Sequence, residues 1–181
     1  MSITVKTISA DEHLAFVAAR GQASFLQLPA WGKAKPEWRS ESVGFFDGDT
    51  LTGVGLILYR QLPKLPRYLA YLPEGPVLDW NRPDVDAHLE ALVAHARRNK
   101  AFAVRIGPTV VHHRWLAPTV KAAIADPGIT ALSQATPDET TLTGTRVLRT
   151  LDHLGWQPQA EGHGFAAGQP KFNYQLRLTD A

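Results

Sequence analysis

Residues 24–80 read SFLQLPAWGKAKPEWRSESVGFFDGDTLTGVGLILYRQLPKLPRYLAYLPEGPVLDW, and this stretch decides the fold. It contains three strand-like runs, at residues 39–46, 51–60 and 67–72. The first two runs flank Asp47-Gly48-Asp49, a sequence typical of a hairpin turn because glycine accepts a positive φ. The last run leaves through Pro73-Glu74-Gly75-Pro76, where the prolines interrupt strand pairing. The stretch therefore predicts an antiparallel meander of three strands.

Signals on either side of the meander complete the predicted architecture. Further strands are expected at residues 3–8, 101–106 and 172–178, and helices at residues 10–20, 83–100, 114–125 and 140–154. Another helix is expected after Ser24, which can cap it with Gln27 in the capping-box position. Leu14, Val17 and Ala18 are expected to form the apolar face of helix 10–20. This order predicts an α/β (α+β) fold with a mixed, largely antiparallel sheet flanked by helices.

Length and composition narrow the class of protein. The 181 residues fit one domain, residues 1–181, with 44% hydrophobic and 20% charged residues. The absence of cysteine excludes disulfides, thiolate metal sites and a cysteine nucleophile. A net charge of +2 is too small to indicate nucleic-acid binding by itself. Neither a signal-peptide core nor a membrane-length apolar run is visible, so a cytoplasmic location is expected.

Two groups of residues are candidates for binding. Lys35 follows Trp31 by one helical turn, so the two side chains should share a face. The alternative for Lys35 is an ordinary solvated lysine at a helix end. Tyr71, Glu74 and Gly75 lie in a loop at a strand end, where binding residues often gather. The alternative there is that the prolines and the glycine only shape the crossover.

Other polar residues give weaker signals. Arg105 lies in an apolar strand, where a buried arginine needs an anion or a partner. An outward-facing arginine on a half-buried strand needs neither, and the alternation favours this reading. His112 and His113 are adjacent and should point apart, so no shared metal is expected. The sequence has no Gly-x-Ser-x-Gly elbow, Walker loop or dinucleotide fingerprint, and no residue stands out as a catalytic base.

Five motifs, taken in order, resemble the Fem family of peptidoglycan aminoacyltransferases. They are Phe25-Leu26-Gln27 with Trp31-Gly32, Lys35 and Trp38; Tyr71-Leu72-Pro73-Glu74-Gly75-Pro76-Val77; Phe102 to Pro108; Leu154-Gly155-Trp156; and Gln169-Pro170-Lys171. The second is similar to the family's Tyr-x-Pro-x-Gly-Pro-Val loop. The resemblance covers nearly the whole chain, and the order of the motifs makes it more specific than any one of them.

The resemblance implies a fold and a reaction. The family fold is a pair of acetyltransferase-like (GNAT) domains, so residues 1–181 resemble the N-terminal half, with a second GNAT-like half as an expected partner. The implied reaction transfers an amino acid from aminoacyl-tRNA to the stem peptide of lipid II or UDP-MurNAc-pentapeptide. Aminoacyl-tRNA is then the co-substrate, no other cofactor is expected, and peripheral association with the cytoplasmic membrane face is possible.

The resemblance also assigns roles and shows one departure. It implies that Lys35 contacts the acceptor's diphosphate and that Tyr71 hydrogen-bonds its sugar or peptide. Many members have an acidic residue where this chain has Gly107. In having a glycine at this position, the chain resembles an actinobacterial-looking subgroup of the family.

Two alternatives remain. One is a non-catalytic module that binds muropeptide precursors or tRNA. The other is a CoA-dependent N-acyltransferase, which the missing Arg/Gln-x-x-Gly-x-Gly/Ala pyrophosphate loop disfavours.

Overall fold

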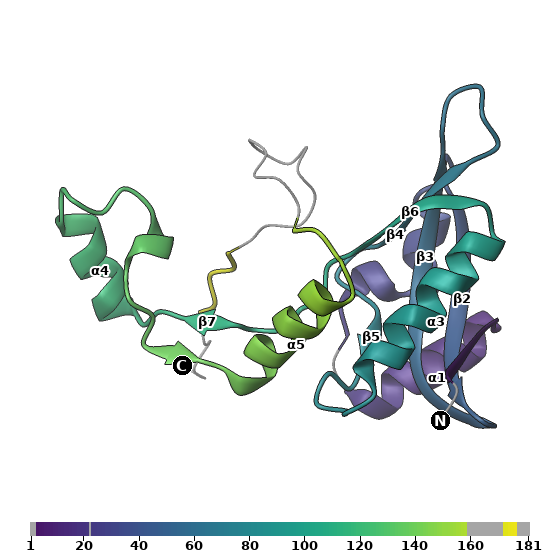
Figure 1. The fold of residues 1–181 in the computed structure, drawn as a ribbon, viewed down its shortest axis with the longest axis horizontal. Helices are drawn as coiled ribbons and strands as arrows, with labels where there is room; N and C mark the ends of the chain where they lie inside the picture. Colours follow the sequence, from purple (N-terminus) through teal and green to yellow (C-terminus); the bar gives the residue numbers. More distant parts are fainter. Residues whose placement is uncertain (1–2, 22, 159–171, 177–181) are drawn as a thin grey trace, which may run out of the picture.

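A computed structural model describes residues 3–21, 23–158 and 172–176 (Figure 1). It has an α/β fold, as predicted, built on a mixed sheet in the order β1-β2-β3-β4-β6, with β5 added to β3. The strands of this sheet are β1 (Ile3–Thr7), β2 (Arg39–Asp47), β3 (Thr50–Gln61), β4 (Tyr68–Leu72), β5 (Val77–Leu78) and β6 (Ala101–Ile106). Its helices are α1 (Ala10–Arg20), η1 (Phe25–Gln27), α2 (Pro29–Lys33) and α3 (Val85–Arg98).

The predicted meander forms the centre of the sheet. Strands β2, β3 and β4 pair antiparallel, and Gly48 turns the first hairpin with φ 59°. β3 is buried along most of its length on both faces, which explains its nearly continuous apolar sequence. Gly53 and Gly55 allow close approach, because a Cβ at Gly53 would lie 2.2 Å from Leu78 Cδ2.

Helices cover both faces of the sheet. Leu92 and Ala96 of α3 join the main core with Val43, Phe45 and Ile57 of the meander. On the other face lie α1, η1 and α2. From α3 the chain enters β6, which runs parallel to β4 and ends beside it, Leu72 being paired with Ile106. This parallel crossover brings the ends of β4 and β6 to the same edge of the sheet.

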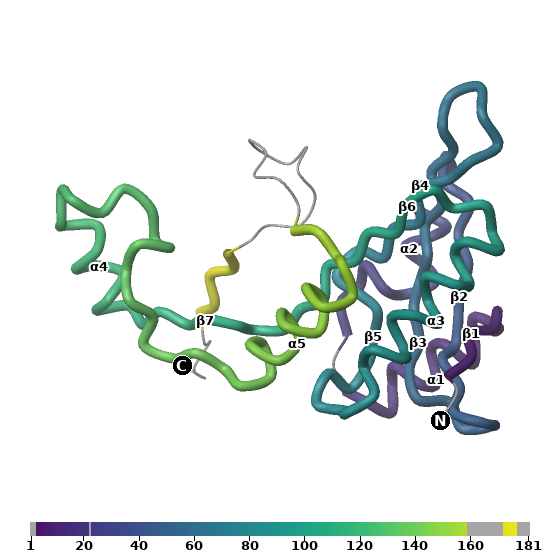
Figure 2. The backbone as a smooth tube through the Cα atoms, viewed as in Figure 1, coloured from purple at the N-terminus to yellow at the C-terminus, as the bar shows by residue number. Residues whose placement is uncertain are grey.

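Residues 107–158 leave the sheet and come back to it through their last helix (Figures 1 and 2). They contain β7 (His113–Arg114), α4 (Ala117–Ala125), η2 (Leu132–Gln134), β8 (Glu139–Thr140) and α5 (Leu142–His153). β7 and β8 form a separate two-stranded ribbon. α5 returns toward the sheet and contacts the segment before α3, where Arg146 Nη2 donates to the Trp80 carbonyl at 3.2 Å.

Several expectations about these elements were wrong. The buried side of α1 is formed around His13, whereas Leu14 is 44% exposed and Ala18 is also exposed. The helix expected at 114–125 begins only at Ala117, because His113 and Arg114 pair with β8. Residues 172–176 form no strand; the remainder of the strand expected at 172–178 and the Gln169-Pro170-Lys171 motif lie outside the described residues.

Candidate functional site

An aromatic and cationic cluster lies across β3, β4 and β6. Tyr71 of β4 pairs in register with Arg105 of β6, and the Arg105 guanidinium lies 5.7 Å from the Tyr71 ring centre. Trp38 also lies near Tyr71, with ring centres 6.4 Å apart. Arg60 at the end of β3 lies 5.6 Å from the Trp38 ring. The fold thus gathers two arginines and two aromatic rings from four segments of the chain.

A second group lies directly before this cluster in the chain. Lys35 Nζ sits 5.1 Å from the Trp31 ring centre, so the expected sharing of a face is confirmed. Phe25 packs edge-on against Trp31 at 5.5 Å and is itself 64% exposed. Trp31 is therefore half-buried beneath an exposed phenyl ring and a lysine. The Lys35 carbonyl accepts a hydrogen bond from Trp38 N–H at 2.9 Å, which links the two groups through one turn.

The loop Pro73-Glu74-Gly75-Pro76 is held by Gln27, which the sequence indicated only as a capping residue and as part of a family motif. Gln27 is fully buried, its Nε2 donates to the Pro73 carbonyl at 2.6 Å, and its Oε1 accepts from Leu56 N–H at 3.0 Å. The predicted capping box at Gln27 is therefore wrong, although Ser24 does cap η1. Gln27 instead ties η1 and the central strand β3 to the candidate loop.

Gly75 has a packing role in this arrangement. A Cβ at Gly75 would lie 2.3 Å from Gln27 Cδ, far inside van der Waals contact, so only glycine fits beside this glutamine. The Gly75 N–H donates to the Leu72 carbonyl at 3.3 Å, and its own carbonyl accepts from Gly107 N–H at 3.3 Å. Approach of the Gly75 amide to a ligand thus stays a prediction. Glu74 is half-buried with φ 51°, at the tip of the turn.

Two buried titratable groups lie behind the candidate site. Glu41 accepts hydrogen bonds from Thr7 Oγ1 (2.6 Å), Tyr59 Oη (2.9 Å) and His95 Nε2 (3.1 Å). Burial alone would raise the pKa of Glu41, but these hydrogen bonds, that from His95 first, lower it to about 2. Burial lowers the pKa of His13 to about 4, although the Gln27 backbone acts in the opposite direction. Both groups join helices to the sheet.

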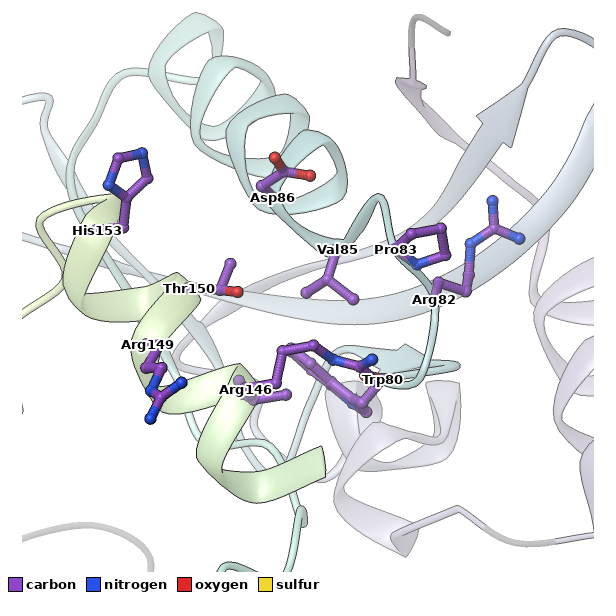
Figure 3. A pocket seen from close by; sticks show the side chains of 10 residues that line it. Trp80, Arg82, Pro83, Val85, Asp86, Arg146, Arg149, Thr150 and His153 are labelled. Carbon is purple, nitrogen blue, oxygen red and sulfur yellow. The ribbon is translucent and has the colours of Figure 1, made fainter. Parts of the chain in front are cut away.

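A shallow hollow of about 250 Å³ lies between the start of α3 and α5 (Figure 3). Its lining includes Trp80, Arg146, Arg149, Thr150 and His153. None of the residues predicted to bind a ligand lines this hollow. Arg146 lies alongside Trp80 there and uses its guanidinium to anchor α5.

The described residues contain no cluster of three or more His, Asp or Glu side chains that could hold a metal ion. The expectation that His112 and His113 point apart was wrong, since their ring centres are 3.7 Å apart. The irregular backbone before β7 allows this close contact of the two rings, which a regular strand would not. The cation-aromatic groups can bind an anion beside a flat, partly apolar ligand.

Comparison with known proteins identifies the family. The FemAB family model matches residues 8–181, nearly the whole chain. The chain belongs to the FemAB family. It is 36% identical over 106 residues to a lipid II:glycine glycyltransferase of Staphylococcus saprophyticus, covering 57% of this chain and 26% of that protein. It is 34% identical over 109 residues to the enzyme of the same name from Staphylococcus epidermidis, with the same coverage.

A solved structure supports the fold. The crystal structure of FemX matches with a TM-score of 0.59 and 25% sequence identity, over 88% of this chain and 34% of FemX. The chain spans about a quarter of the length of the curated relatives. Among the described residues, no helix has the length and apolar character needed to cross a membrane.

Proposed function

We propose that this chain is the acceptor-binding part of an aminoacyltransferase that builds peptidoglycan cross-bridges. The acceptor would be the stem peptide of lipid II or UDP-MurNAc-pentapeptide, and the donor would be aminoacyl-tRNA with no further cofactor. Membership in the FemAB family and similarity to two proteins named lipid II:glycine glycyltransferase support this reaction. Residues 1–181 would then be one GNAT-like domain that works with a second half at the cytoplasmic face of the membrane.

The observation that carries the proposal is the arrangement of cations and rings around β4. Lys35, Arg60 and Arg105 each lie within 5.7 Å of an aromatic ring centre, on Trp31, Trp38 and Tyr71 respectively. Such a surface suits an acceptor that joins a diphosphate to a sugar and a peptide. Cations bind the phosphates, whereas the rings contact the sugar or the peptide backbone.

The proposed roles follow from where each side chain lies. Lys35 supplies a point charge for the diphosphate, and Tyr71 supplies a ring and a hydroxyl for the sugar or peptide. Arg105 stacks near Tyr71 and orients it, and Glu74 stands at the loop tip, where a carboxylate can bind an amino group of the peptide. Gly75 allows Gln27 to fix the loop that presents Glu74.

The reaction itself needs no protein nucleophile. The aminoacyl ester of the donor is already activated, and the acceptor's amine is the nucleophile. Catalysis therefore consists of positioning the two substrates, removing a proton from the amine and stabilising the tetrahedral oxyanion. The second half would supply the groups that complete this step.

A non-catalytic module that binds the same precursor or tRNA is the second candidate. The match covers only about a quarter of the relatives' length. One part of a transferase would bind its substrate without turnover, which is what this second candidate predicts. A CoA-dependent N-acyltransferase is disfavoured by the missing pyrophosphate loop.

Calorimetry with UDP-MurNAc-pentapeptide tests the proposal. Lys35→Ala should weaken binding by about 1 kcal/mol or more, the size of a charge-assisted hydrogen bond. Lys33→Ala is the matched control, because Lys33 is exposed at the end of α2, two residues before Lys35. It should leave the affinity unchanged. Equal losses in both variants would show a general charge effect, and an unchanged Lys35→Ala would remove Lys35 from the site.

A further inference from the structure

The β3–β4 hairpin projects beyond the end of the sheet (Figure 1). Its loop, residues 62–67, is ordered by hydrogen bonds from Leu62 N–H to the Arg67 carbonyl (2.9 Å) and from Gln61 Nε2 to the Leu65 carbonyl (3.2 Å). Leu65 at the tip is 55% exposed, between two prolines. The hairpin therefore holds an apolar side chain away from the body of the protein on a stiff support.

Exposed cations surround the base of this hairpin, because several elements begin or end at the same end of the sheet. They are Arg39, Arg60, Lys64, Arg67, Arg97, Arg98 and Lys100, and we call them the basic end. One backbone and one side-chain hydrogen bond bring the segments together. Tyr68 N–H donates to the Lys100 carbonyl at 3.2 Å, and Arg39 Nη1 donates to Asn99 Oδ1 at 3.4 Å.

The acidic groups are distributed unevenly. No Asp or Glu occurs between Thr50 and Pro73, the stretch that contains the hairpin. At the basic end, Glu41 is bound to His95 inside the protein and Glu37 is the exposed carboxylate. Five aspartates lie at the opposite end, in the β2–β3 turn and before or within the first turn of α3: Asp47, Asp49, Asp79, Asp84 and Asp86. A net charge of only +2 thus hides an uneven distribution of charge, even though Arg82 pairs with Asp84 at the acidic end.

We propose that the basic end docks the protein on an anionic lipid bilayer, with Leu65 inserted among the headgroups. Cations of this kind are attracted to anionic lipid, and an exposed leucine adds apolar burial at the interface. This inference rests on the proposed function only in its choice of the inner membrane surface, where a lipid-linked acceptor would be presented. Arg60 belongs to both regions, so docking would place the Arg60–Trp38 side of the candidate site nearer the bilayer than the Pro73–Pro76 loop.

The side chains at the tip favour lipid over RNA. Single-stranded RNA sites present aromatic rings on which bases stack, and residues 61–67 contain none. They present leucine and proline between Lys64 and Arg67 instead. Binding should weaken as salt rises, because the attraction between exposed charges is screened.

Sedimentation with vesicles tests the proposal. The probe is a vesicle of phosphatidylcholine and phosphatidylglycerol at about two to one, compared with phosphatidylcholine alone. The wild type should bind only the anionic vesicles. The double variant Lys64→Glu, Arg67→Glu should lose about tenfold or more in partitioning, and Leu65→Ser about threefold to tenfold.

The control carries the same charge change elsewhere. Lys121→Glu combined with Arg149→Glu alters two exposed cations of α4 and α5 and should stay within about twofold of the wild type. Circular dichroism of each variant checks that it is folded. Equal losses in both double variants, or no loss in the hairpin variant, would overturn the proposal. Binding of tRNA but not of vesicles, lost in the hairpin variant, would assign the surface to RNA and overturn it too.

The two proposals fail separately. The vesicles contain no precursor, so docking can fail while the acceptor site stands. Conversely, the hairpin variant should bind UDP-MurNAc-pentapeptide like the wild type, since neither Lys64 nor Arg67 belongs to the candidate site.

Discussion

Replacing Gly75 with alanine should destabilise the protein by about 2–4 kcal/mol, and the loss should depend on Gln27. The new Cβ would lie 2.3 Å, 2.4 Å and 2.5 Å from Gln27 Cδ, Oε1 and Nε2. Gln27 cannot swing aside without cost, because it is fully buried and bridges Pro73 and Leu56 by hydrogen bonds. Moving it leaves two buried backbone groups unpaired, at about 1–3 kcal/mol each.

A double-mutant cycle isolates this contact. Gln27→Ala alone should also destabilise, since it removes both hydrogen bonds. In the Gln27→Ala background, however, the space beside residue 75 is open and Gly75→Ala should change stability little. The double variant should therefore lose about 2 kcal/mol less stability than the two single losses added together.

Urea unfolding followed by circular dichroism measures the four stabilities. Gly128→Ala is the control, because Gly128 lies in an exposed loop. A Cβ added there would lie 3.2 Å from the Asp126 Oδ1 atom, its nearest neighbour. Its effect should be below about 0.5 kcal/mol and independent of Gln27. Losses from Gly75→Ala and Gln27→Ala that add to within about 0.5 kcal/mol would refute the reasoning.

Two further predictions concern helix α1. His13 has its folded pKa lowered to about 4 by burial, so the unfolded chain binds the extra proton more readily. The stability that neutral His13 contributes is fully present above its ordinary pKa near 6.5, and about 3 kcal/mol of it should be lost as the pH falls toward 4. In His13→Gln, the midpoint of urea unfolding should therefore depend less on pH between about 6.5 and about 4 than in the wild type. Ser9 caps α1 by accepting from Glu12 N–H at 3.2 Å, and Ser9→Ala should cost about 1 kcal/mol in urea unfolding. No loss in Ser9→Ala would mean that the cap is replaced by water.

The sequence by itself determined the elements whose signals are local. The structure has a helix at Ala10–Arg20, a hairpin around Gly48 and a strand at Ala101–Ile106, as predicted, and Lys35, just past the end of α2, lies beside Trp31. Caps, turn glycines and side-chain periodicity act over a few residues, so they can be read without knowing what packs against them. The family resemblance followed from motifs of the same short kind.

Tertiary structure alone decided which of these residues meet. Arg60 and Trp38 join Tyr71 only because the strands fold back on one another, and Gln27 becomes a bridge only once β3 and the loop lie beside it. His13, and not Leu14, lies on the buried side of α1, where its Nδ1 is 3.1 Å from Ser42 Oγ of the neighbouring strand.

The polarity of the molecule has the same origin. The seven cations of the basic end come from five segments of the chain, so no local charge run announces them. Periodicity fixes the direction of a side chain on its own element, but its neighbours depend on pairings between residues far apart in sequence. That is why the sequence predicted the elements and single candidate residues, whereas the cation-aromatic site and the basic end emerged only from the fold.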